Sequence, residues 1–303
     1  MRISKYHGTG NDFVFVEDLD GRLDIAPSFV AAVCDRHRGV GGDGLIRVVR
    51  GDARGGDGAD FFMDYTNAEG QPAEMCGNGI RCLAVYVYER DLTSKTRLAV
   101  DTRAGLKMLD LHMAGGRVRS VTVDMGVPAL ARGQIPMTGG DPAARVTAEP
   151  LEAAGRTWAM SAVSMGNPHC VLFLDDADDL TSMDVPGIGR EIEHLPLFPN
   201  RTNVEFVEVP DPARVRMRVW ERGVGETLAC GTGACAALVA SAVTGRTGRS
   251  ADVEVPGGRL NVEWREDGRV MLTGPATFVF DADLSDEWAR AVGLSGVPTA
   301  AAS

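Results

Sequence analysis

The sequence predicts an α+β fold made of two pseudo-symmetric halves, each a mostly antiparallel sheet or barrel around a central helix. Three observations predict it. Short apolar runs bounded by Gly, Asn, Asp or Pro recur along the chain, two longer apolar segments suit helices, and two motifs are repeated at nearly one spacing. At 303 residues, 44% of them hydrophobic, the chain is long enough for two domains with cores of their own.

The strands are expected where apolar residues form short runs or alternate with polar ones. Arg214–Trp220 alternates throughout, which is typical of a half-buried antiparallel strand. Helices are expected over 80–90 and 234–243, and also near 28–37 and 187–194. The Gly-, Pro- and Ala-rich segment 132–156 is expected to hold the crossover between the halves. The expected strands are 11–17, 45–49, 61–65, 97–101, 117–124, 170–174, 203–209, 214–220, 252–255, 259–264 and 269–273.

Two motifs are repeated along the chain. Gly10-Asn11-Asp12 and Gly166-Asn167-Pro168 each lead into an apolar run, at an offset of 156 residues. Cys76-Gly-Asn-Gly79 and Cys230-Gly-Thr-Gly233 each lead into an expected helix, at an offset of 154 residues. Two independent motifs at almost the same offset indicate a duplicated unit of about 150 residues. The alternative is coincidence between glycine-rich turns.

Charge and terminal sequence exclude several classes of protein. The formal net charge is −11, so the chain lacks the basic footprint of a protein that binds nucleic acid or an anionic membrane surface. The N-terminal residues contain no apolar signal-peptide segment, and no run approaches the length of a membrane span. We therefore expect a cytoplasmic protein.

The six cysteines divide into two groups. In a chain of this length without a Cys-x-x-Cys motif, we expect thiols in a reducing compartment rather than a disulfide framework. Cys34, Cys82, Cys170 and Cys235 are expected to pack in or near the core. Cys76 and Cys230 differ from these four because each precedes a Gly-x-Gly sequence at the start of an expected helix.

A cysteine at the start of a helix is suited to acid–base chemistry. The first helical turn exposes unpaired N–H groups, and together with the helix dipole these favour negative charge. We therefore expect the pKa of such a thiol to fall, and the same N–H groups to bind a substrate carboxylate.

Two such thiols facing one carbon would suit inversion of a stereocentre. One thiolate removes a proton from one face while the other thiol donates a proton to the opposite face, and the N–H groups stabilise the enediolate between these steps. The sequence contains no motif for pyridoxal phosphate, and its histidines have no metal-ligand spacing. We therefore expect neither a cofactor nor a metal.

In these motifs the chain resembles the diaminopimelate epimerase family, whose members are amino acid racemases and epimerases that do not use pyridoxal phosphate. The matching segments span most of the sequence. They include Lys5–Asp12, Asn67–Gly70, Met75–Cys82, Ser164–Cys170, Arg201–Glu205, Trp220–Thr227, Ala229–Cys235 and Gly274–Ala276. The resemblance implies a homodimeric epimerase that interconverts LL- and meso-diaminopimelate in lysine and peptidoglycan precursor biosynthesis.

The resemblance also implies roles for individual residues. Cys76 and Cys230 would be the acid–base pair, and His169 and Glu221 would tune the ionisation of these thiols. No side-chain contact is expected from Gly44, where some members of the family have glutamine. The carboxylate of the reacting centre would be bound by Gly77, Asn78, Gly231 and Thr232. The rest of the substrate would be bound by Asn11, Asn67, Asn167, Asn203, Glu221 and Arg222.

The expected domains follow from the repeat and the resemblance. Residues 1–126 and 274–303 would form the half that carries Cys76, and residues 127–273 the half that carries Cys230. The active site would lie in the cleft between them.

Other interpretations remain open on the residues alone. Asn67 and Asn203 could be turn residues, His169 a structural histidine, and Glu221-Arg222 a solvated pair at the end of a strand. The chain could racemise another amino acid, such as proline or hydroxyproline. It could also bind an amino acid without catalysis, or sense redox state through a Cys76–Cys230 disulfide.

Overall fold

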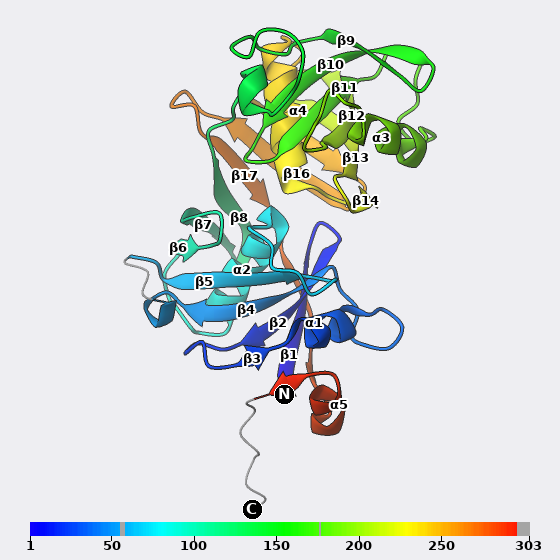
Figure 1. Cartoon of the computed structure of the whole chain (residues 1–303). Coiled ribbons are helices and arrows are strands. Elements are labelled where there is room, and N and C mark those ends of the chain that lie inside the picture. The colour runs from blue at the N-terminus through cyan, green and yellow to red at the C-terminus, as the bar shows by residue number, and fades with distance from the viewer. Residues whose placement is uncertain (55–57, 176, 296–303) are drawn as a thin grey trace, which may run out of the picture. The chain divides into compact units, whose positions relative to one another are not determined.

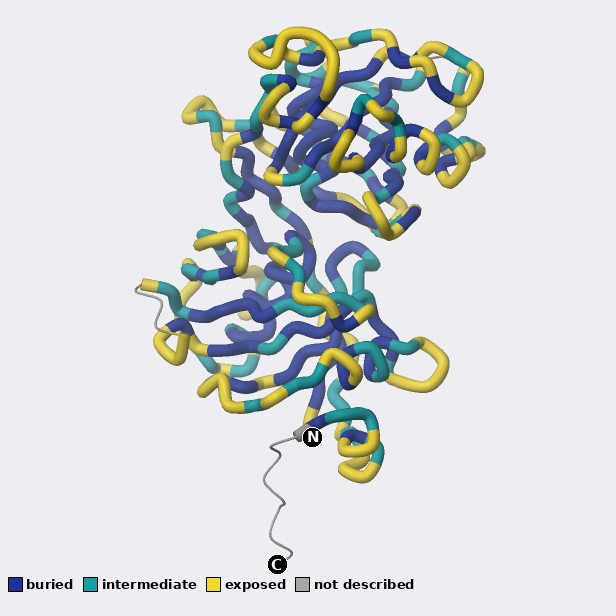
Figure 2. Tube along the Cα trace, in the orientation of Figure 1, coloured by how far each residue is buried: buried dark blue, intermediate teal, exposed yellow. Residues whose placement is uncertain are grey.

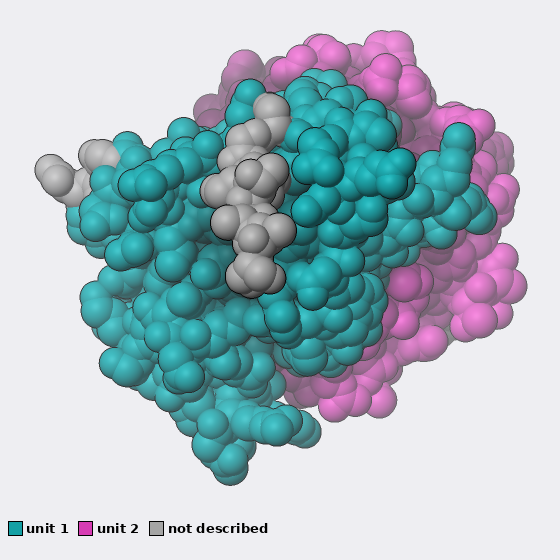
Figure 3. Space-filling model, turned by 90° about the horizontal axis from the view of Figure 1, so that it is seen from below, with its two compact units in different colours: residues 1–123, 275–303 teal, residues 124–274 magenta. Residues whose placement is uncertain are grey.

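The computed structural model describes residues 1–54, 58–175 and 177–295, and its fold is α+β (Figure 1). The predicted class is therefore confirmed. The chain divides into two compact units, coloured separately in Figure 3: unit 1 comprises residues 1–123 and 275–303, and unit 2 comprises residues 124–274. Residues 296–303 of the expected N-terminal half, and residues 55–57 and 176, lie outside the described residues.

Unit 1 is a mixed sheet in which most neighbouring strands are antiparallel. The strands pair in the order β18–β1–β2–β4–β5–β6–β7–β8, and only β2–β4 and β5–β6 are parallel. The elements are β1 (Arg2–Gly8), β2 (Asn11–Glu17), β3 (Asp24–Ile25), α1 (Pro27–Cys34), β4 (Gly44–Arg50), the 3-10 helix η1 (Asp52–Arg54), β5 (Phe61–Asn67), α2 (Gly77–Glu89), β6 (Arg97–Asp101), β7 (Lys107–Ala114), β8 (Arg117–Gly126), β18 (Thr277–Asp283), α5 (Asp286–Ala291) and β19 (Leu294–Ser295).

Unit 2 repeats this order of pairings. Its strands run β9–β10–β11–β12–β13–β15–β16–β17, and the parallel pairs, β11–β12 and β13–β15, occupy the same places in the order. The repeated motifs thus stand at equivalent points of a repeated topology. The elements are the 3-10 helix η2 (Arg132–Gln134), β9 (Glu149–Ala153), β10 (Arg156–Ser164), β11 (Pro168–Phe173), α3 (Val185–Glu193), β12 (Asn203–Asp211), β13 (Arg214–Glu221), β14 (Gly225–Thr227), α4 (Gly231–Val243), β15 (Ser250–Val255), β16 (Gly258–Trp264) and β17 (Val270–Gly274).

A buried helix lies at the centre of each unit (Figures 1 and 2). Every residue from Gly77 to Val87 of α2 is buried, and α4 is buried from Gly233 to Ser241. A helix that is apolar on all sides must be surrounded by protein. Helix α2 contacts β1, β2, β4, β7 and β18, and α4 contacts β10, β11, β12, β13, β15, β16 and β17. The sheet of each unit therefore curves around its helix.

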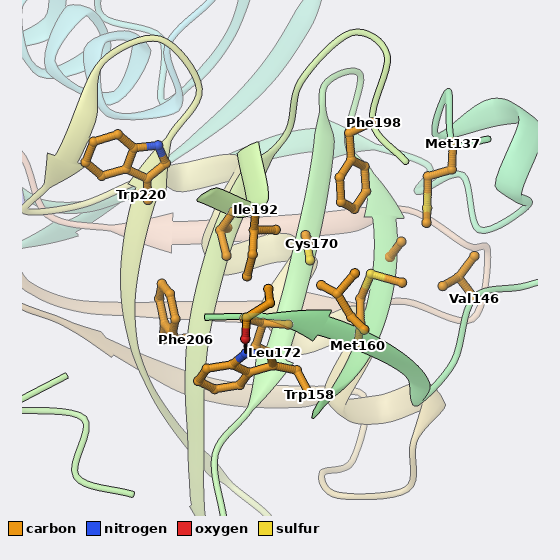
Figure 4. Packing of buried hydrophobic residues seen from close by; sticks show 14 of the residues in the cluster. Met137, Val146, Trp158, Met160, Cys170, Leu172, Ile192, Phe198, Phe206 and Trp220 are labelled. Atoms are coloured by element: carbon orange, nitrogen blue, oxygen red, sulfur yellow. Dashed lines mark hydrogen bonds between the residues drawn. The ribbon is translucent and has the colours of Figure 1, made fainter. Parts of the chain in front are cut away.

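A second helix completes each core. In unit 2, α3 packs on β12 and β13, and Ile192 of α3 joins a cluster with Trp158 and Phe206, whose rings meet edge to face (Figure 4). In unit 1, Phe29 and Val33 of α1 join the equivalent cluster with residues of β1, β2 and β4.

All eleven expected strands are present, with ends within two residues of the expected ones. The central helices begin three residues earlier than expected because each Gly-x-Gly sequence itself forms the first turn. One expectation was wrong: segment 132–156 lies inside unit 2 and contains β9, whereas the first boundary between the units falls within β8.

The four cysteines expected to pack are buried, Cys34 at 4% exposure and Cys82, Cys170 and Cys235 at 0%. Burial raises the pKa of Cys34 to about 11 and that of Cys82 to about 12, so both remain thiols at neutral pH. In the described part of the chain, no helix is long and apolar enough to cross a membrane.

Candidate functional site

Each unit carries a cysteine at the residue before its central helix. Cys76 precedes α2 and Cys230 precedes α4, both with extended backbone angles (φ −131° and −117°). The first-turn N–H groups of a helix lack partners within the helix itself. The thiol, the glycine that follows it and the next residue therefore lie together at an electropositive helix end in both units.

In unit 1 the thiol is hydrogen-bonded to the asparagine that begins β2. Cys76 Sγ donates to Asn11 Oδ1 at 3.3 Å, and Asn78 Nδ2 donates to the same oxygen at 3.2 Å. The other end of the Asn11 amide is fixed as well, because its Nδ2 donates to Asp43 Oδ2 at 2.6 Å. Asp43 therefore orients Asn11 with its carbonyl oxygen toward the thiol.

Arg81, which is fully buried one turn into α2, supports this arrangement. Its guanidinium donates to Gly77 O at 3.0 Å and to Asn78 Oδ1 at 2.9 Å. Arg81 thus fixes the two residues after Cys76 and leaves Asn78 Nδ2 directed at Asn11 Oδ1.

The other expected site position of unit 1 lies at the end of β5. Asn67 Oδ1 accepts hydrogen bonds from Glu69 N at 3.1 Å and Gln71 N at 2.8 Å, so its carbonyl stabilises a turn. Gly44 pairs with Asn67 across β4 and β5, and a Cβ there would lie 2.5 Å from the Tyr65 ring and 2.6 Å from Thr66 O. A side chain at position 44 would therefore collide with β5.

In unit 2 the thiol is more deeply buried, at 6% exposure. Cys230 Sγ accepts a hydrogen bond from Gly233 N at 3.4 Å and lies 3.5 Å from Thr232 Oγ1. Thr232 Oγ1 also accepts from Asn167 Nδ2 at 3.3 Å. Asn167, which immediately precedes β11, therefore contacts the second residue after Cys230, as Asn11 contacts Asn78 in unit 1.

The expected lowering of thiol pKa is wrong for Cys230. Burial raises the pKa of Cys230 well above its ordinary value, and the carboxylates of Glu221 and Glu205 raise it further. The hydrogen bonds of Thr232 and Gly233 N oppose this shift but do not outweigh it. Desolvation and negative charge both disfavour a thiolate, and here they exceed the effect of the helix end.

His169 connects this site to a buried carboxylate. His169 Nδ1 lies 2.6 Å from Glu205 Oε1, and Nε2 lies 3.0 Å from Asn167 Oδ1. Both the histidine and Glu205 have 0% side-chain exposure. Glu205 has no role assigned from the sequence, because its place between Val204 and Phe206 in the expected strand 203–209 does not mark it as buried.

Glu221 is the last residue of β13 and is followed by Arg222, and Asn203 is the first residue of the neighbouring strand β12. The carboxylate of Glu221 accepts a hydrogen bond from Thr227 Oγ1. Burial raises the pKa of Glu221, against hydrogen bonds from Thr227 and Cys230 that lower it. Asn203 Nδ2 donates to Pro168 O and its Oδ1 accepts from Arg222 N, both at 2.9 Å, while the exposed Arg222 side chain bonds to Asn200 O at 3.2 Å. Asn203 therefore holds the backbone at Arg222.

The structure thus forms two clusters. Asn11, Cys76 and Asn78 come together in unit 1, with Asn67 at a separate turn. Asn167, His169, Thr232, Cys230 and Glu221 come together in unit 2. A cavity of about 240 Å³ in unit 1, near Arg47, Asp64 and Arg103, is lined by none of these residues. Among the described residues, no group of three or more His, Cys, Asp or Glu side chains could hold a metal ion.

Comparison with known proteins shows which family the chain is similar to. The family model described as diaminopimelate epimerase matches residues 3–131 and 161–279. The chain is 48% identical to the diaminopimelate epimerase of Desulfitobacterium hafniense over 95% of this chain and 99% of that protein, and 49% identical to that of Moorella thermoacetica over 93% and 99%.

Solved structures with much lower sequence identity share the fold. A probable proline racemase from Agrobacterium radiobacter aligns with a TM-score of 0.67 at 12% identity, covering 95% of both chains. A PhzF-family phenazine biosynthesis protein from Bacillus anthracis aligns with a TM-score of 0.65 at 15% identity, covering 94% of this chain and 99% of that one.

Proposed function

Because the chain belongs to the diaminopimelate epimerase family, we propose that it interconverts LL- and meso-diaminopimelate by a two-base mechanism that needs no bound cofactor. Cys76 and Cys230 are the acid and the base in this proposal. One observation carries it: each unit presents a cysteine directly before a buried helix, beside an asparagine from the start of an equivalent strand. Binding alone would not need a thiol at both places.

The proposal requires both clusters to act on one substrate, in a cleft between the units. The α-carboxylate of the reacting centre would accept hydrogen bonds from Gly77-Asn78 and Gly231-Thr232, where helix N–H groups favour negative charge. Removal of the α-proton by one thiolate places further charge on this carboxylate as an enediolate. The same donors would stabilise that charge, since they are already oriented. The second thiol then returns a proton to the opposite face of the carbon.

The substrate has a second amino acid end, which needs its own partners. We propose that Asn11, Asn67, Asn167, Asn203, Glu221 and Arg222 bind the remainder of the molecule. Arg222 suits the distal carboxylate because its guanidinium can donate two parallel hydrogen bonds. Glu221 and His169 would also tune the ionisation of Cys230, which is supported by the effect of Glu221 on the pKa of that thiol.

The cellular setting is part of the proposal. Diaminopimelate epimerisation would place the enzyme in lysine and peptidoglycan precursor biosynthesis. We place the enzyme in the cytoplasm, where thiols such as Cys76 and Cys230 stay reduced. A homodimer is supported by β18, on which Phe278, Val279 and Phe280 are all at least 39% exposed, because a second copy could cover this apolar strand. Sedimentation of the full chain measures the oligomeric state directly.

The mechanism is tested by incubating the chain with LL-diaminopimelate in heavy water without added pyridoxal phosphate. Deuterium should enter the α-carbon as the meso isomer forms. Cys76→Ala and Cys230→Ala should each reduce inversion by about 10²–10⁴-fold, since each removes an acid–base group. Cys82→Ala, which removes a buried packing thiol, is the control and should leave the mechanism intact.

Three results would contradict all or part of the proposal. Full inversion by either single variant would exclude a two-base mechanism. Binding of diaminopimelate without exchange of the α-proton would indicate a binding protein on the same fold. Activity on proline or hydroxyproline in a substrate panel, with none on diaminopimelate, would leave the mechanism but exclude the substrate.

A further inference from the structure

The buried pair of His169 and Glu205 has a hydrogen-bonding pattern that, in the amide orientation of this structure, calls for a donor at both ring nitrogens of the histidine. Nδ1 faces the carboxylate oxygen Oε1 of Glu205 at 2.6 Å, and Nε2 faces the amide oxygen Oδ1 of Asn167 at 3.0 Å. Both of these atoms accept hydrogen bonds. A neutral imidazole has one N–H and can donate only one such bond, whereas an imidazolium donates two.

The Asn167 amide contacts both the histidine ring and Thr232. Its Nδ2 donates to Thr232 Oγ1 at 3.3 Å and its Oδ1 faces the ring. Because the Thr232 hydroxyl can donate or accept a hydrogen bond, it does not fix the amide, whereas a ring that donates from Nε2 would. The contacts therefore form a continuous chain from Glu205 through His169, Asn167 and Thr232 to Cys230 Sγ.

Glu205 also needs a cation. It has 0% side-chain exposure, and within the described residues its second oxygen, Oε2, accepts no hydrogen bond. A buried carboxylate without enough hydrogen-bond donors is costly unless a positive charge lies beside it. His169 is the basic side chain in contact with it. A protonated His169 would supply the positive charge beside Glu205, and Glu205 would accept one of its two N–H hydrogen bonds.

We propose that Glu205 is a positioning residue that keeps His169 protonated at both ring nitrogens, so that the ring fixes the Asn167 amide with Nδ2 toward Thr232. The consequence for catalysis at Cys230 rests on the proposed function, whereas the protonation of His169 does not. Glu205 touches no reacting atom in this scheme, because it acts through the histidine.

Other titratable groups surround the pair and must be considered with it. Glu221 of β13 and Cys230 at the start of α4 interact electrostatically with His169 or Glu205, and so does Cys170, the next residue on β11. On β10, the residue opposite His169 is the apolar Val163. An imidazolium at position 169 offsets one of the two carboxylates beside Cys230, so its loss would leave both uncompensated.

The equivalent place in unit 1 has no charge. His169 pairs with Asn203 across the parallel strands β11 and β12, as Phe13 pairs with Gly44 across β2 and β4. Two residues further on, Glu205 therefore corresponds to Ile46. The repeated fold does not need a carboxylate here, which favours a role in the chemistry of unit 2.

The direct test is nitrogen-15 NMR of the full chain labelled at histidine, with His169 assigned by comparison with His169→Asn. At neutral pH both ring nitrogens of His169 should carry protons, as the two hydrogen bonds to acceptors require. The half-exposed ring of His194 serves as the internal reference. A His169 ring with a single proton would overturn the proposal, since the Asn167 amide would then be reversed. This measurement does not require enzymatic activity, so its result is independent of the proposed function.

The variant Glu205→Gln removes the charge and keeps the shape. His169 should lose one ring proton at the same pH, and kcat should fall by about 10–100-fold with a smaller change in KM, as expected when an orienting partner is lost. Glu208→Gln is the matched control, because Glu208 lies on the same strand but bonds to Arg216 and Leu180 N. It should leave both the spectrum and kcat unchanged.

A double-mutant cycle separates positioning from general destabilisation. If Glu205 acts through His169, adding Glu205→Gln to His169→Asn should cause little further loss of kcat. Full additivity, or an unchanged His169 spectrum in Glu205→Gln, would overturn the proposal. If Glu205→Gln does not fold, the spectrum of the unmodified chain decides alone.

Discussion

The two clusters share a backbone and differ in charge. In both units a cysteine precedes a buried helix, and an asparagine at the start of an equivalent strand bonds to the second residue after it. Around Cys76 the corresponding inward positions hold Phe13 and Ile46. Around Cys230 they hold His169 and Glu205.

This difference indicates a division of labour. The repeated backbone places each thiol at a helix end, whereas the unrepeated side chains set the charge around it. Each asparagine is oriented by a carboxylate, but by different routes: Asp43 bonds Asn11 directly, and Glu205 reaches Asn167 through His169. A reaction that needs one acid and one base at the same moment benefits from two similar sites that are not electrostatically equal.

The largest difference between the two clusters is expected when one methyl group is added at equivalent glycines. At Gly233 a Cβ would lie 2.9 Å from Glu205 Oε1 and 3.3 Å from Cys230 Sγ. At Gly79 it would lie 2.8 Å from Ile46 Cδ1, the end of a flexible apolar side chain. We expect Gly233→Ala to lower kcat by about tenfold or more, because it displaces a carboxylate fixed by His169.

Gly79→Ala is the matched control for this experiment. Both substitutions gain the same helix propensity, so the difference between them reports the side chains that they meet. Ile46 can move at a cost of about 1–3 kcal/mol of overpacking, with a smaller effect on kcat. Equal losses of kcat in the two variants would show that the charge around Cys230 is unimportant.

The second comparison is of thiol reactivity. Cys76 is partly exposed, whereas Cys230 is 6% exposed and burial raises its pKa well above the ordinary range. Alkylation depends on access and on the thiolate fraction, so limited iodoacetamide treatment should label Cys76 at least about tenfold faster than Cys230.

Peptide mapping by mass spectrometry at several pH values gives both rates. Because the pKa of Cys230 is raised, its thiolate fraction and labelling rate should still increase with pH beyond about 8.5, the value of an ordinary thiol. Labelling of Cys230 before Cys76 would reverse the comparison.

The smallest expected effect concerns acid stability. Asp12 of unit 1 occupies the place of Pro168 in unit 2, and it pairs with Lys5 Nζ at 2.7 Å and with Arg36 NH2 at 2.6 Å. Burial alone would raise the pKa of Asp12, but hydrogen bonds from Arg36 and Lys5 outweigh it and bring the pKa to about 2. The ionised Asp12 therefore stabilises the folded state at pH values above its pKa in the unfolded chain, near 3.9. This stabilisation is lost as the pH falls toward the folded pKa of about 2.

Thermal unfolding of Asp12→Asn measures this term. At pH 7 the variant should be less stable than the parent chain by up to about 2 kcal/mol, and the difference should shrink below a pH of about 4. Asp20→Asn is the control, because Asp20 is 54% exposed and its ion pairs at 3.5 Å should contribute little. A pH-independent difference for Asp12→Asn would contradict the assignment.

Much of the fold could be predicted from local patterns, and the exceptions have a common cause. Three of the strands that were not predicted, β3, β14 and β19, have only two or three residues. The other five, β1, β7, β9, β10 and β18, contain polar, Ala or Met residues where a strand signal needs a clear apolar alternation. In β1, Ser4 and Lys5 are buried because they have partners from other segments, Asp281 and Asp12. Such partners cannot be identified from the strand alone.

The candidate site was predictable in part for the same reason. Spacing singled out Cys76 and Cys230, since a cysteine before Gly-x-Gly and a helix is a local pattern that occurs twice. Glu205 lies in the matching segment Arg201–Glu205 but received no role, because a carboxylate in a strand is unusual only when its burial and its partner are known. The direction of the Cys230 pKa was also mispredicted, since a helix end acts locally whereas desolvation depends on everything packed around the thiol.

The α+β class, the repeated motifs, the places of the two central helices and the two cysteines could be predicted from the sequence, because each depends on residues close together in the chain. How polar groups distant in the chain satisfy one another became known from the three-dimensional fold. It paired Glu205 with His169 and Asp43 with Asn11, and it gave Asn203 to the backbone at Arg222. The physical reason is that hydrogen bonds and desolvation depend on three-dimensional neighbours, which the order of residues specifies only through the complete fold.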